Sequence, residues 1–327
     1  MIRLFAKAQY DFLHWRNAAY LITALFVVGG MVPLATRGLN TSIEFTGGTE
    51  LQIQAKKPQI TSGSIRAALD QGGMTGAEIQ TFGAPDAFLV RTRLSAHADV
   101  NQASASATAA RADTLLARTF GPGTYAIGRY AAVGPRVGSE LRSRAILAVL
   151  MSFGATLLYL WFRFEWRFSV AAIIATAHDI LTTFAFISIM HLEVSLVVVA
   201  ALLTIVGYSL NDTIITMDRM RENLHKFKRA HLYEVINRSV NETLPRTILS
   251  SGTVLAATLA LLIFGGEVIR GFAWVMVWGV VTGTFSSIYI ASPMLLLIER
   301  KWPGEDARGA RALTPAAAAP TAPARPS

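Results

Sequence analysis

The chain has 327 residues, a formal net charge of +9 and no cysteine. It is 52% hydrophobic and its mean hydropathy is +0.42, whereas ordinary soluble domains are roughly 45–50% apolar. The absence of cysteine excludes disulfides and thiolate metal sites. Lys and Arg gather beside the apolar runs, as membrane topology requires, and no motif for nucleic-acid recognition accompanies them. The composition therefore indicates a polytopic membrane protein.

The first apolar run lies near the N-terminus, at residues 17–36, after a polar segment at 1–16. About 20 apolar residues are needed to cross ~30 Å of hydrocarbon. The run is too long for the apolar region of a signal peptide, and further runs follow it. We expect a cytoplasmic N-terminal segment and a retained transmembrane helix.

Residues 37–144 contain no such run and alternate between strand-like and helix-like patterns. The expected elements are a strand at 49–55, a helix at 61–73, strands at 77–83 and 87–95, a helix at 99–121 and a strand at 124–134. This β-α-β-β-α-β order is that of the ferredoxin-like split motif. The expected fold is therefore an α+β ferredoxin-like domain, which by itself indicates no function.

Five further apolar runs follow within a membrane region at 145–300. The expected transmembrane helices are 145–162, 168–190, 194–218, 246–266 and 271–298. A charged cytoplasmic loop is expected at 219–245. The tail at 301–327 is rich in Ala and Pro and lacks large apolar residues, so we expect it to be disordered.

The distribution of basic residues predicts the orientation. They gather at 219–246, in the link "RFEWR" and directly after the last run, whereas the links "HLE" and "GEVIRG" on the other side hold only Arg270. Short cytoplasmic loops carry the excess of Lys and Arg. Both termini are therefore expected to face the cytoplasm, and the domain at 37–144 to lie in the periplasm.

Ionisable residues interrupt two of the apolar runs. The run at 194–218 contains Asp212, and the run at 168–190 contains His178 and Asp179. Helical spacing places Asp212 on a stripe with other polar residues, and Asn211 lies beside it. The other members of the stripe are Thr204, Tyr208, Thr216 and Arg219. Such a stripe is expected to face other helices or a wet cavity, since lipid offers it no partners.

Two interpretations of Asp212 remain open at this point. It either packs helices together through a hydrogen bond or carries protons, and intramembrane carboxylates commonly have functional roles. Burial favours a protonated carboxyl and a nearby cation favours an ionised one. A buried Asp with a movable Arg would therefore load and release protons. Arg246 enters the run at 246–266 from the side toward which Asp212 is displaced, and it is either such a partner or an ordinary interfacial anchor. For Asp179 the same alternatives stand, whereas His178 is expected to make an interhelical hydrogen bond.

Small residues predict close packing between helices. Gly279 and Gly283 form one pair at four-residue spacing, and Gly252 and Ala256 form another. Arg219 is most simply a residue of the charged membrane boundary. The sequence contains no Walker A loop, GxSxG elbow or HExxH pair. We therefore expect no enzymatic activity, cofactor or metal.

Several motifs together resemble the SecF family of Sec translocase accessory subunits. They are "EFTGGTELQIQ", "VGPRVGSELRSRAILAVL", "AHDILTTFAFISI", "LLTIVGYSLNDTIITMDRMREN", "NETLPRTILSSGTVL" and "FGGEVIRGFAWVMVWGVVTGTFSSIYIASPML". The match runs in order over residues 15–300. One departure is Glu44, where the family usually has Asp before Phe-Thr-Gly-Gly, with the charge preserved.

The resemblance implies a polytopic helical protein of the resistance-nodulation-division superfamily, with six transmembrane helices forming half of a pseudo-symmetric core. It implies a place in the bacterial inner membrane and use of the proton-motive force to help preproteins through the SecYEG channel. The implied partners are SecD, SecYEG, YajC or YidC, and translocating preproteins. The proton-relay carboxylate of the family matches Asp212 in "GYSLNDT", and its basic partner matches Arg246 in "LPRT". Supporting residues would include Asn211, Tyr208, Thr216, Asp179, His178 and Arg219.

Three alternatives are weighed against this hypothesis. A structural subunit would use Asp212 only for packing. An intramembrane aspartyl protease would need Asp179 and Asp212 about 3 Å apart, but counting along the helices places them roughly 8–10 Å apart in depth, and a GxGD motif is missing. A small-molecule exporter half of the same superfamily would normally belong to a chain of twelve spans with larger outer domains.

Overall fold

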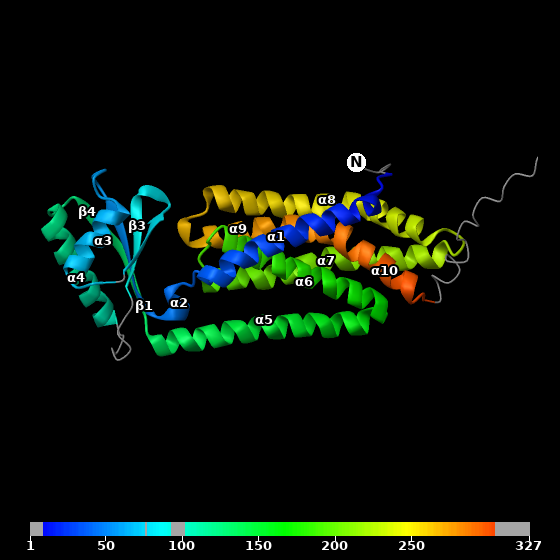
Figure 1. Ribbon diagram of the computed structural model, residues 1–327, viewed down its shortest axis with the longest axis horizontal. Helices are drawn as coiled ribbons and strands as arrows, with labels where there is room; N and C mark the ends of the chain where they lie inside the picture. The colour runs from blue at the N-terminus through cyan, green and yellow to red at the C-terminus, as the bar shows by residue number, and fades with distance from the viewer. Residues whose placement is uncertain (1–8, 76, 93–101, 305–327) are drawn as a thin grey trace, which may run out of the picture.

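Six long helices and a separate α+β domain make up the chain in the computed structural model, which describes residues 9–75, 77–92 and 102–304 (Figure 1). The helices lie side by side in one bundle, and the domain lies at one end of it. We call that end the domain end. The first described residues and α10 lie toward the opposite end of the bundle.

All six predicted spans are confirmed as helices that are long and apolar enough to cross a membrane. They are α1 (Arg16–Arg37), α5 (Pro135–Arg163), α6 (Trp166–Ile189), α7 (Leu196–Lys226), α8 (Leu232–Phe264) and a last span formed by α9 (Glu267–Ser286), the π-helical turn η2 (Ser287–Ala291) and α10 (Ser292–Lys301). A short 3₁₀ turn, η1 (Phe12–Trp15), precedes α1. Residues 305–327, which include most of the tail predicted to be disordered, lie outside the described residues.

The structure differs from the sequence prediction between the fourth and fifth spans. Residues 219–245 are mostly helical, because α7 continues to Lys226 and α8 already begins at Leu232. The two helices pack together there through polar contacts. The buried Asn223 side chain donates a hydrogen bond to Ser239 at 2.9 Å. A charged sequence that resembles a loop is thus held helical by partners across the turn.

The α+β domain contains the predicted order of strands and helices. Its elements are β1 (Gly48–Ala55), α3 (Ser62–Gln71), β2 (Glu78–Phe82), β3 (Ala84–Thr92), α4 (Gln102–Phe120) and β4 (Tyr125–Val133). The strands form one antiparallel sheet in the order β2-β3-β1-β4. Residues 93–101, where the third strand was expected to end and the second helix to begin, lie outside the described residues.

Alternation along β1 builds the core of this domain. Leu51 and Ile53 are buried on one face of the sheet, where they join Ile65 and Leu69 of α3 and Leu116 of α4 in one cluster. Side chains two residues apart on a strand share a face. The alternating apolar residues of β1 therefore form the face of the sheet that packs against α3 and α4. A short helix, α2 (Ile43–Thr46), connects the end of α1 to β1.

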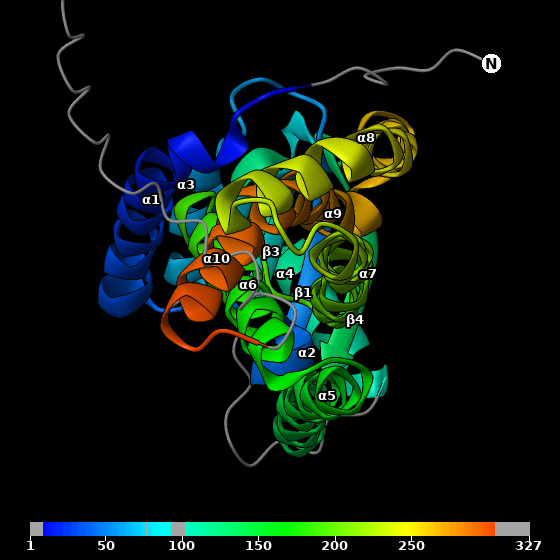
Figure 2. The same ribbon diagram turned by 90° about the vertical axis from the view of Figure 1, so that its right-hand side faces the viewer.

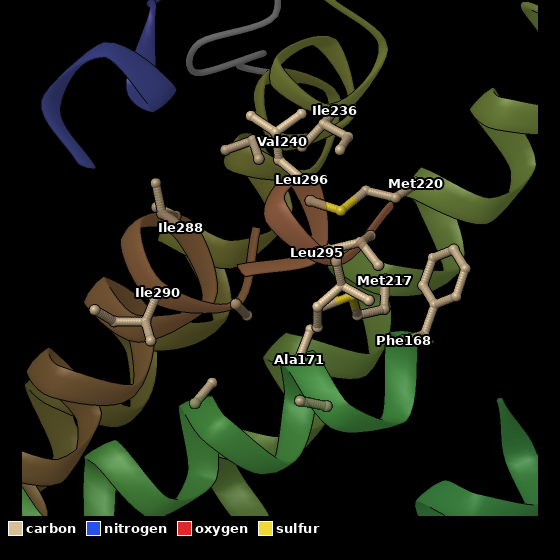
Figure 3. Close-up of a cluster of buried hydrophobic side chains, with 14 of the residues drawn as sticks. Phe168, Ala171, Met217, Met220, Ile236, Val240, Ile288, Ile290, Leu295 and Leu296 are labelled. Atoms are coloured by element: carbon tan, nitrogen blue, oxygen red, sulfur yellow. The ribbon is translucent and has the colours of Figure 1, made fainter. Parts of the chain in front are cut away.

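The bundle has a buried centre and three less buried helices. Within the most apolar window of each span, 67% of the residues of the last span and 50% of those of α6 and α7 are buried, against 17% for α8, 11% for α1 and 6% for α5. Viewed along the bundle, α1 and α5 lie at its edge (Figure 2). A hydrophobic cluster fills the region between α6, α7, α8 and α10 (Figure 3). Its side chains include Phe168, Ala171, Met217, Met220, Ile236, Val240, Leu295 and Leu296.

Candidate functional site

Asp212 of α7 is buried between α8 and η2, with 6% of its surface exposed. Its Oδ1 accepts a hydrogen bond from Thr247 Oγ1 at 2.7 Å, and its Oδ2 accepts one from Ser287 Oγ at 2.9 Å. The two donors come from α8 and η2. The carboxylate therefore connects three helical elements through neutral hydroxyl groups.

Asp179 of α6 occupies a similar environment and is 1% exposed. Its Oδ2 accepts hydrogen bonds from Ser286 Oγ at 2.7 Å and from the Ser209 hydroxyl. Its Oδ1 lies 2.9 Å from Nδ1 of the adjacent His178. The other ring nitrogen of His178 is buried and has no hydrogen-bond partner among the described residues. The predicted interhelical hydrogen bond of His178 is therefore wrong for the described residues, because its ring bonds to the neighbouring Asp179 and reaches α9 only by stacking on Phe285, with ring centroids 6.5 Å apart.

The consecutive residues Ser286 and Ser287 donate hydrogen bonds to Asp179 and Asp212, respectively. Helical neighbours point about 100° apart, so one hydroxyl reaches Asp179 on α6 and the other reaches Asp212 on α7. Each hydroxyl also has a backbone acceptor three residues earlier, at 3.1 Å for Ser286 and 3.0 Å for Ser287. A hydroxyl has one proton to donate. Each serine can therefore switch its hydrogen bond between the carboxylate and its own helix.

The backbone around these serines is irregular. The π-helical turn begins at Ser287, and Pro293 follows it in α10. The Ser292 hydroxyl donates a hydrogen bond to the Ser287 carbonyl at 2.7 Å. This bond provides a donor for a backbone carbonyl within the irregular turn. Turns of this kind occur often at functional sites. The sequence alone predicts no functional role for the two serines.

Among the described residues, no hydrogen bond joins Asp179 to Asp212, since their side chains bond to hydroxyl groups and one imidazole. An aspartyl protease dyad shares one proton between carboxylates about 3 Å apart. The geometry of the two residues offers no support for that alternative.

Arg246 lies one residue before Thr247 on α8 and is exposed. Within the part of the chain that the structure describes, its side chain forms no ion pair or hydrogen bond. The predicted pair of Asp212 and Arg246 therefore comes from neighbouring positions on α7 and α8, without direct contact.

The predicted polar stripe on α7 lies along the edge of the bundle. Thr216 is buried with 2% exposure, Tyr208 is half-buried, and Thr204 and Asn211 are exposed. The Thr204 hydroxyl donates to the Ala200 carbonyl of its own helix at 2.8 Å. One side of the stripe thus faces the other helices, and the other side lies on the surface of the chain.

Arg219, the last member of the stripe, belongs to a separate ion-pair network at the end opposite the domain. It pairs with Glu222 and with Glu242 of α8, each at 2.7 Å. Glu242 also pairs with Arg238 at 2.8 Å. Seven residues of helix separate Arg219 from Asp212, a rise of roughly 10 Å.

The two predicted packing pairs differ in their surroundings. A Cβ atom at Gly279 of α9 would lie 2.2 Å from Ile205 Cδ1, and one at Gly283 would lie 3.0 Å from Ser209 Cβ, so α9 and α7 are in close contact. A Cβ atom at Gly252 of α8 would meet no described atom within 4 Å, and Ala256 is exposed. The second pair therefore faces away from the other described helices.

A cavity of about 450 Å³ lies at the domain end. Arg37, Arg66 and Arg91 are among its lining residues, and neither Asp179 nor Asp212 is. The described residues contain no group of three His, Asp or Glu side chains that could hold a metal ion.

Family models and relatives agree on one assignment. Residues 114–301 match the model of the protein export membrane protein SecD/SecF, C-terminal, and residues 34–59 match the SecD/SecF GG motif. A protein translocase subunit SecF from Gemmatimonas aurantiaca is 51% identical over 324 residues, which cover 98% of this chain and 97% of that protein. The corresponding subunit from Escherichia coli O157:H7 is 37% identical over 298 residues, which cover 90% of each chain.

Two solved structures are similar to this chain in fold. SecDF from Thermus thermophilus, described as a translocon-associated membrane protein, has a TM-score of 0.80 at 34% identity over 92% of this chain. A SecDF structure in a super-membrane-facing form has a TM-score of 0.64 at 34% identity over 90% of this chain. The chain spans 40% and 39% of the length of those SecDF chains. It belongs to the SecD/SecF family of protein export membrane proteins and groups with the SecF subunits of that family.

Proposed function

We propose that this chain is the SecF-like half of a complex with SecD, which uses the proton-motive force to promote preprotein translocation and release through the SecYEG channel. The observation that carries the proposal is the setting of Asp212. It is buried within a membrane span, and the only side chains that donate to it among the described residues are two hydroxyls. A buried carboxylate without a cation in contact is readily neutralised by a proton.

The proposed relay uses the two hydrogen-bonding states of Ser287. When Asp212 is ionised, Ser287 and Thr247 donate to it. When Asp212 takes up a proton, the carboxyl becomes a donor itself, and Ser287 turns to the Thr284 carbonyl at 3.0 Å. Arg246 is the nearby charge that favours release of the proton. Loss of these bonds loosens the contact of α7 with α8 and η2, so proton binding is coupled to helix packing.

The available energy suits a modest conformational change. One proton that crosses the membrane carries about 2.3 kcal/mol per 100 mV of potential. That amount biases two states that differ by a few kcal/mol. One of the two similar SecDF structures is described as a super-membrane-facing form, and a protein with more than one form suits this proposal.

The test is Asp212→Asn in the complex of this chain with SecD, reconstituted in vesicles that contain SecYEG. We expect it to abolish the part of preprotein translocation that an uncoupler removes from the parent. The matched control is Asp218→Asn, since Asp218 lies six residues along the same helix in surface ion pairs with Arg163 and Arg221. The control is expected to retain the response. Normal proton dependence in Asp212→Asn would instead support a purely structural subunit.

The proposal includes a location and an architecture. Basic residues at the end opposite the domain, among them Arg163, Arg219 and Arg221, support a cytoplasmic location for that end and a periplasmic one for the domain. The inner membrane is the corresponding location. The antiparallel order β4-β1-β3-β2 with both helices in one core suits a ferredoxin-like domain, and the six spans suit half of a resistance-nodulation-division core. Single cysteines, introduced at either end of this cysteine-free chain, would report the orientation through labelling of intact cells.

A further inference from the structure

The segment from Asn40 to Gly48, "NTSIEFTGG", is fastened to the loop at 190–195 that joins α6 to α7. The Ser42 amide donates to the Val194 carbonyl at 2.9 Å, and the Val194 amide donates to the Asn40 carbonyl at 2.7 Å. Thr41 and Val194 form a parallel β-bridge. We call residues 40–48 the linker segment and residues 190–195 the α6–α7 loop.

Glu44 of the linker segment also reaches the first residue of α7. Its Oε2 accepts a hydrogen bond from the Leu196 amide at 2.6 Å. The first amide groups of a helix have no partner within the helix, and a negative charge there is favourable. The Ser195 hydroxyl accepts from the Val198 amide at 3.4 Å. The helix that carries Asp212 is therefore capped in part by a side chain from outside the bundle.

Two further contacts hold the linker segment and the domain in place. On one side, a Cβ atom at Gly138 of α5 would lie 2.9 Å from the Gly47 amide nitrogen, so the two backbones are in close contact. On the other side, Arg91 of β3 forms an ion pair with Glu193 of the α6–α7 loop and a second one with Glu50 of β1 at 3.2 Å. The side chain of Arg91 is 7% exposed. The domain thus contacts the loop directly as well as through the linker segment.

We propose that the linker segment and the α6–α7 loop form a permanently closed joint that transmits displacement of α7 to the α+β domain, with Glu44 as the positioning residue that keeps α7 attached. The α6–α7 loop joins the two helices that carry Asp179 and Asp212. A displacement of either helix therefore displaces the loop and the linker segment bound to it. The inference rests on the proposed function, because it takes proton binding at Asp212 as the source of the movement.

Comparison of Glu44→Ala with Glu44→Gln separates the hydrogen bond to the Leu196 amide from the charge of the Glu44 side chain. The Gln side chain keeps an oxygen that accepts from the Leu196 amide, whereas Ala removes the acceptor. Hydrogen exchange of the complex with SecD is expected to be about fivefold faster over residues 192–198 in Glu44→Ala, which is typical of a lost helix cap. Glu44→Gln is expected to change it by about twofold or less. Proton-driven translocation is expected to fall with Ala and to survive with Gln.

A reversible cross-link tests whether the joint must stay closed. A β-bridge places paired Cα atoms about 5 Å apart, which suits a disulfide, so Thr41→Cys and Val194→Cys can be joined in this cysteine-free chain. We expect the oxidised pair to retain proton-driven translocation. We also expect oxidation to restore translocation when Glu44→Ala is combined with the pair, and reduction to remove it again.

The outcomes distinguish this proposal from the proposed function. If Asp212→Asn abolishes the proton response while Glu44→Ala keeps it in full despite faster exchange at 192–198, the joint is overturned and the relay stands. Loss of translocation on oxidation of the Thr41→Cys, Val194→Cys pair, with recovery on reduction, would mean that the joint has to open and would also overturn the proposal. A normal proton response in Asp212→Asn overturns the relay, whatever the cross-link does.

Discussion

Asp179 and Asp212 differ from Glu299, a third deeply buried carboxylate in the described bundle, in the groups that donate hydrogen bonds to them. Glu299 in α10, which is 2% exposed, accepts from Arg167 at 2.8 Å and from the Gly304 amide at 2.8 Å, so a permanent cation balances its charge. Among the described residues, Asp212 has only hydroxyl donors. Hydroxyls satisfy hydrogen bonds but do not neutralise charge. This contrast separates an ion pair that holds structure from a carboxylate that suits proton exchange.

Removal of one hydroxyl donor is predicted to destabilise the bundle. Ser287→Ala leaves Oδ2 of Asp212 without its donor, and an unsatisfied buried polar group costs about 1–3 kcal/mol. The control is Ser250→Ala, since Ser250 is exposed and its hydroxyl bonds, within the described part of the chain, only to carbonyls of its own helix. The control is expected to stay within about 0.5 kcal/mol of the parent. Denaturant unfolding in detergent measures both, and equal effects would contradict the assigned hydrogen bond.

Glu193, in the loop outside the membrane spans, gives a pH prediction. Burial raises the pKa of Glu193, and the neighbouring Arg91 opposes that effect without cancelling it, while Glu50 and Glu44 add to it. A carboxyl with a raised pKa in the folded state binds its proton more tightly there than in the unfolded chain. Its contribution to stability is complete below the ordinary value of 4.5 and is lost as the pH rises through the raised value.

Glu193→Gln is therefore expected to flatten the decline of the melting temperature as the pH rises. Thermal unfolding of the parent and the variant in detergent, at a series of pH values from 4.5 to 8, measures the difference. The Gln variant still accepts a hydrogen bond from Arg91 but no longer titrates. Parallel curves for the two proteins would show that Glu193 keeps its ordinary proton affinity.

At the scale of elements, the contact between α7 and α9 depends on glycine. Gly279→Ala would place a methyl group against Ile205, where overpacking typically costs about 1–3 kcal/mol. Gly252→Ala makes the same chemical change on α8, where no described atom lies within 4 Å. It is expected to be neutral or to stabilise the helix by up to ~1 kcal/mol. Unfolding of the isolated chain in detergent compares the two, and the order of stabilities would be reversed if α9 packed elsewhere.

The elements differ in how well the sequence predicts them, for physical reasons. Apolar runs predict the six spans because burial in lipid needs length and hydrophobicity, and alternation predicts β1 because one of its faces is buried. The helical continuation of α7 to Lys226 was missed because its charged residues are stabilised by partners on α8. Asp212 stands out as a charge in an apolar run. Ser286, by contrast, lies 107 residues from Asp179 in the chain. The sequence around either residue does not predict the hydrogen bond between them.

At the scale of the whole molecule, one lateral face is unsuited to lipid. Gly207 and Asn211 of α7 and Gly252 and Ala256 of α8 are exposed, although their helices pack together through Asp212. Small and polar residues on a membrane helix commonly mark contact with another helix. The SecDF chains are more than twice as long as this one. Under the proposed function, this face is where SecD packs, and it places the polar stripe of α7 inside the assembled complex.

Leucine substitutions on this face are predicted to weaken assembly without unfolding the chain. Gly207→Leu and Gly252→Leu add bulk where no atom of the described residues lies within 4 Å of a Cβ atom at either position. A packing cost of about 1–3 kcal/mol at the interface would lower affinity for SecD roughly 5- to 100-fold. Gly154→Leu on the peripheral helix α5 is the control, since no described atom lies within 4 Å there either. Co-purification with SecD from detergent should fall for the first two variants only, with unchanged melting of each chain alone, and an equal loss for Gly154→Leu would place the contact elsewhere.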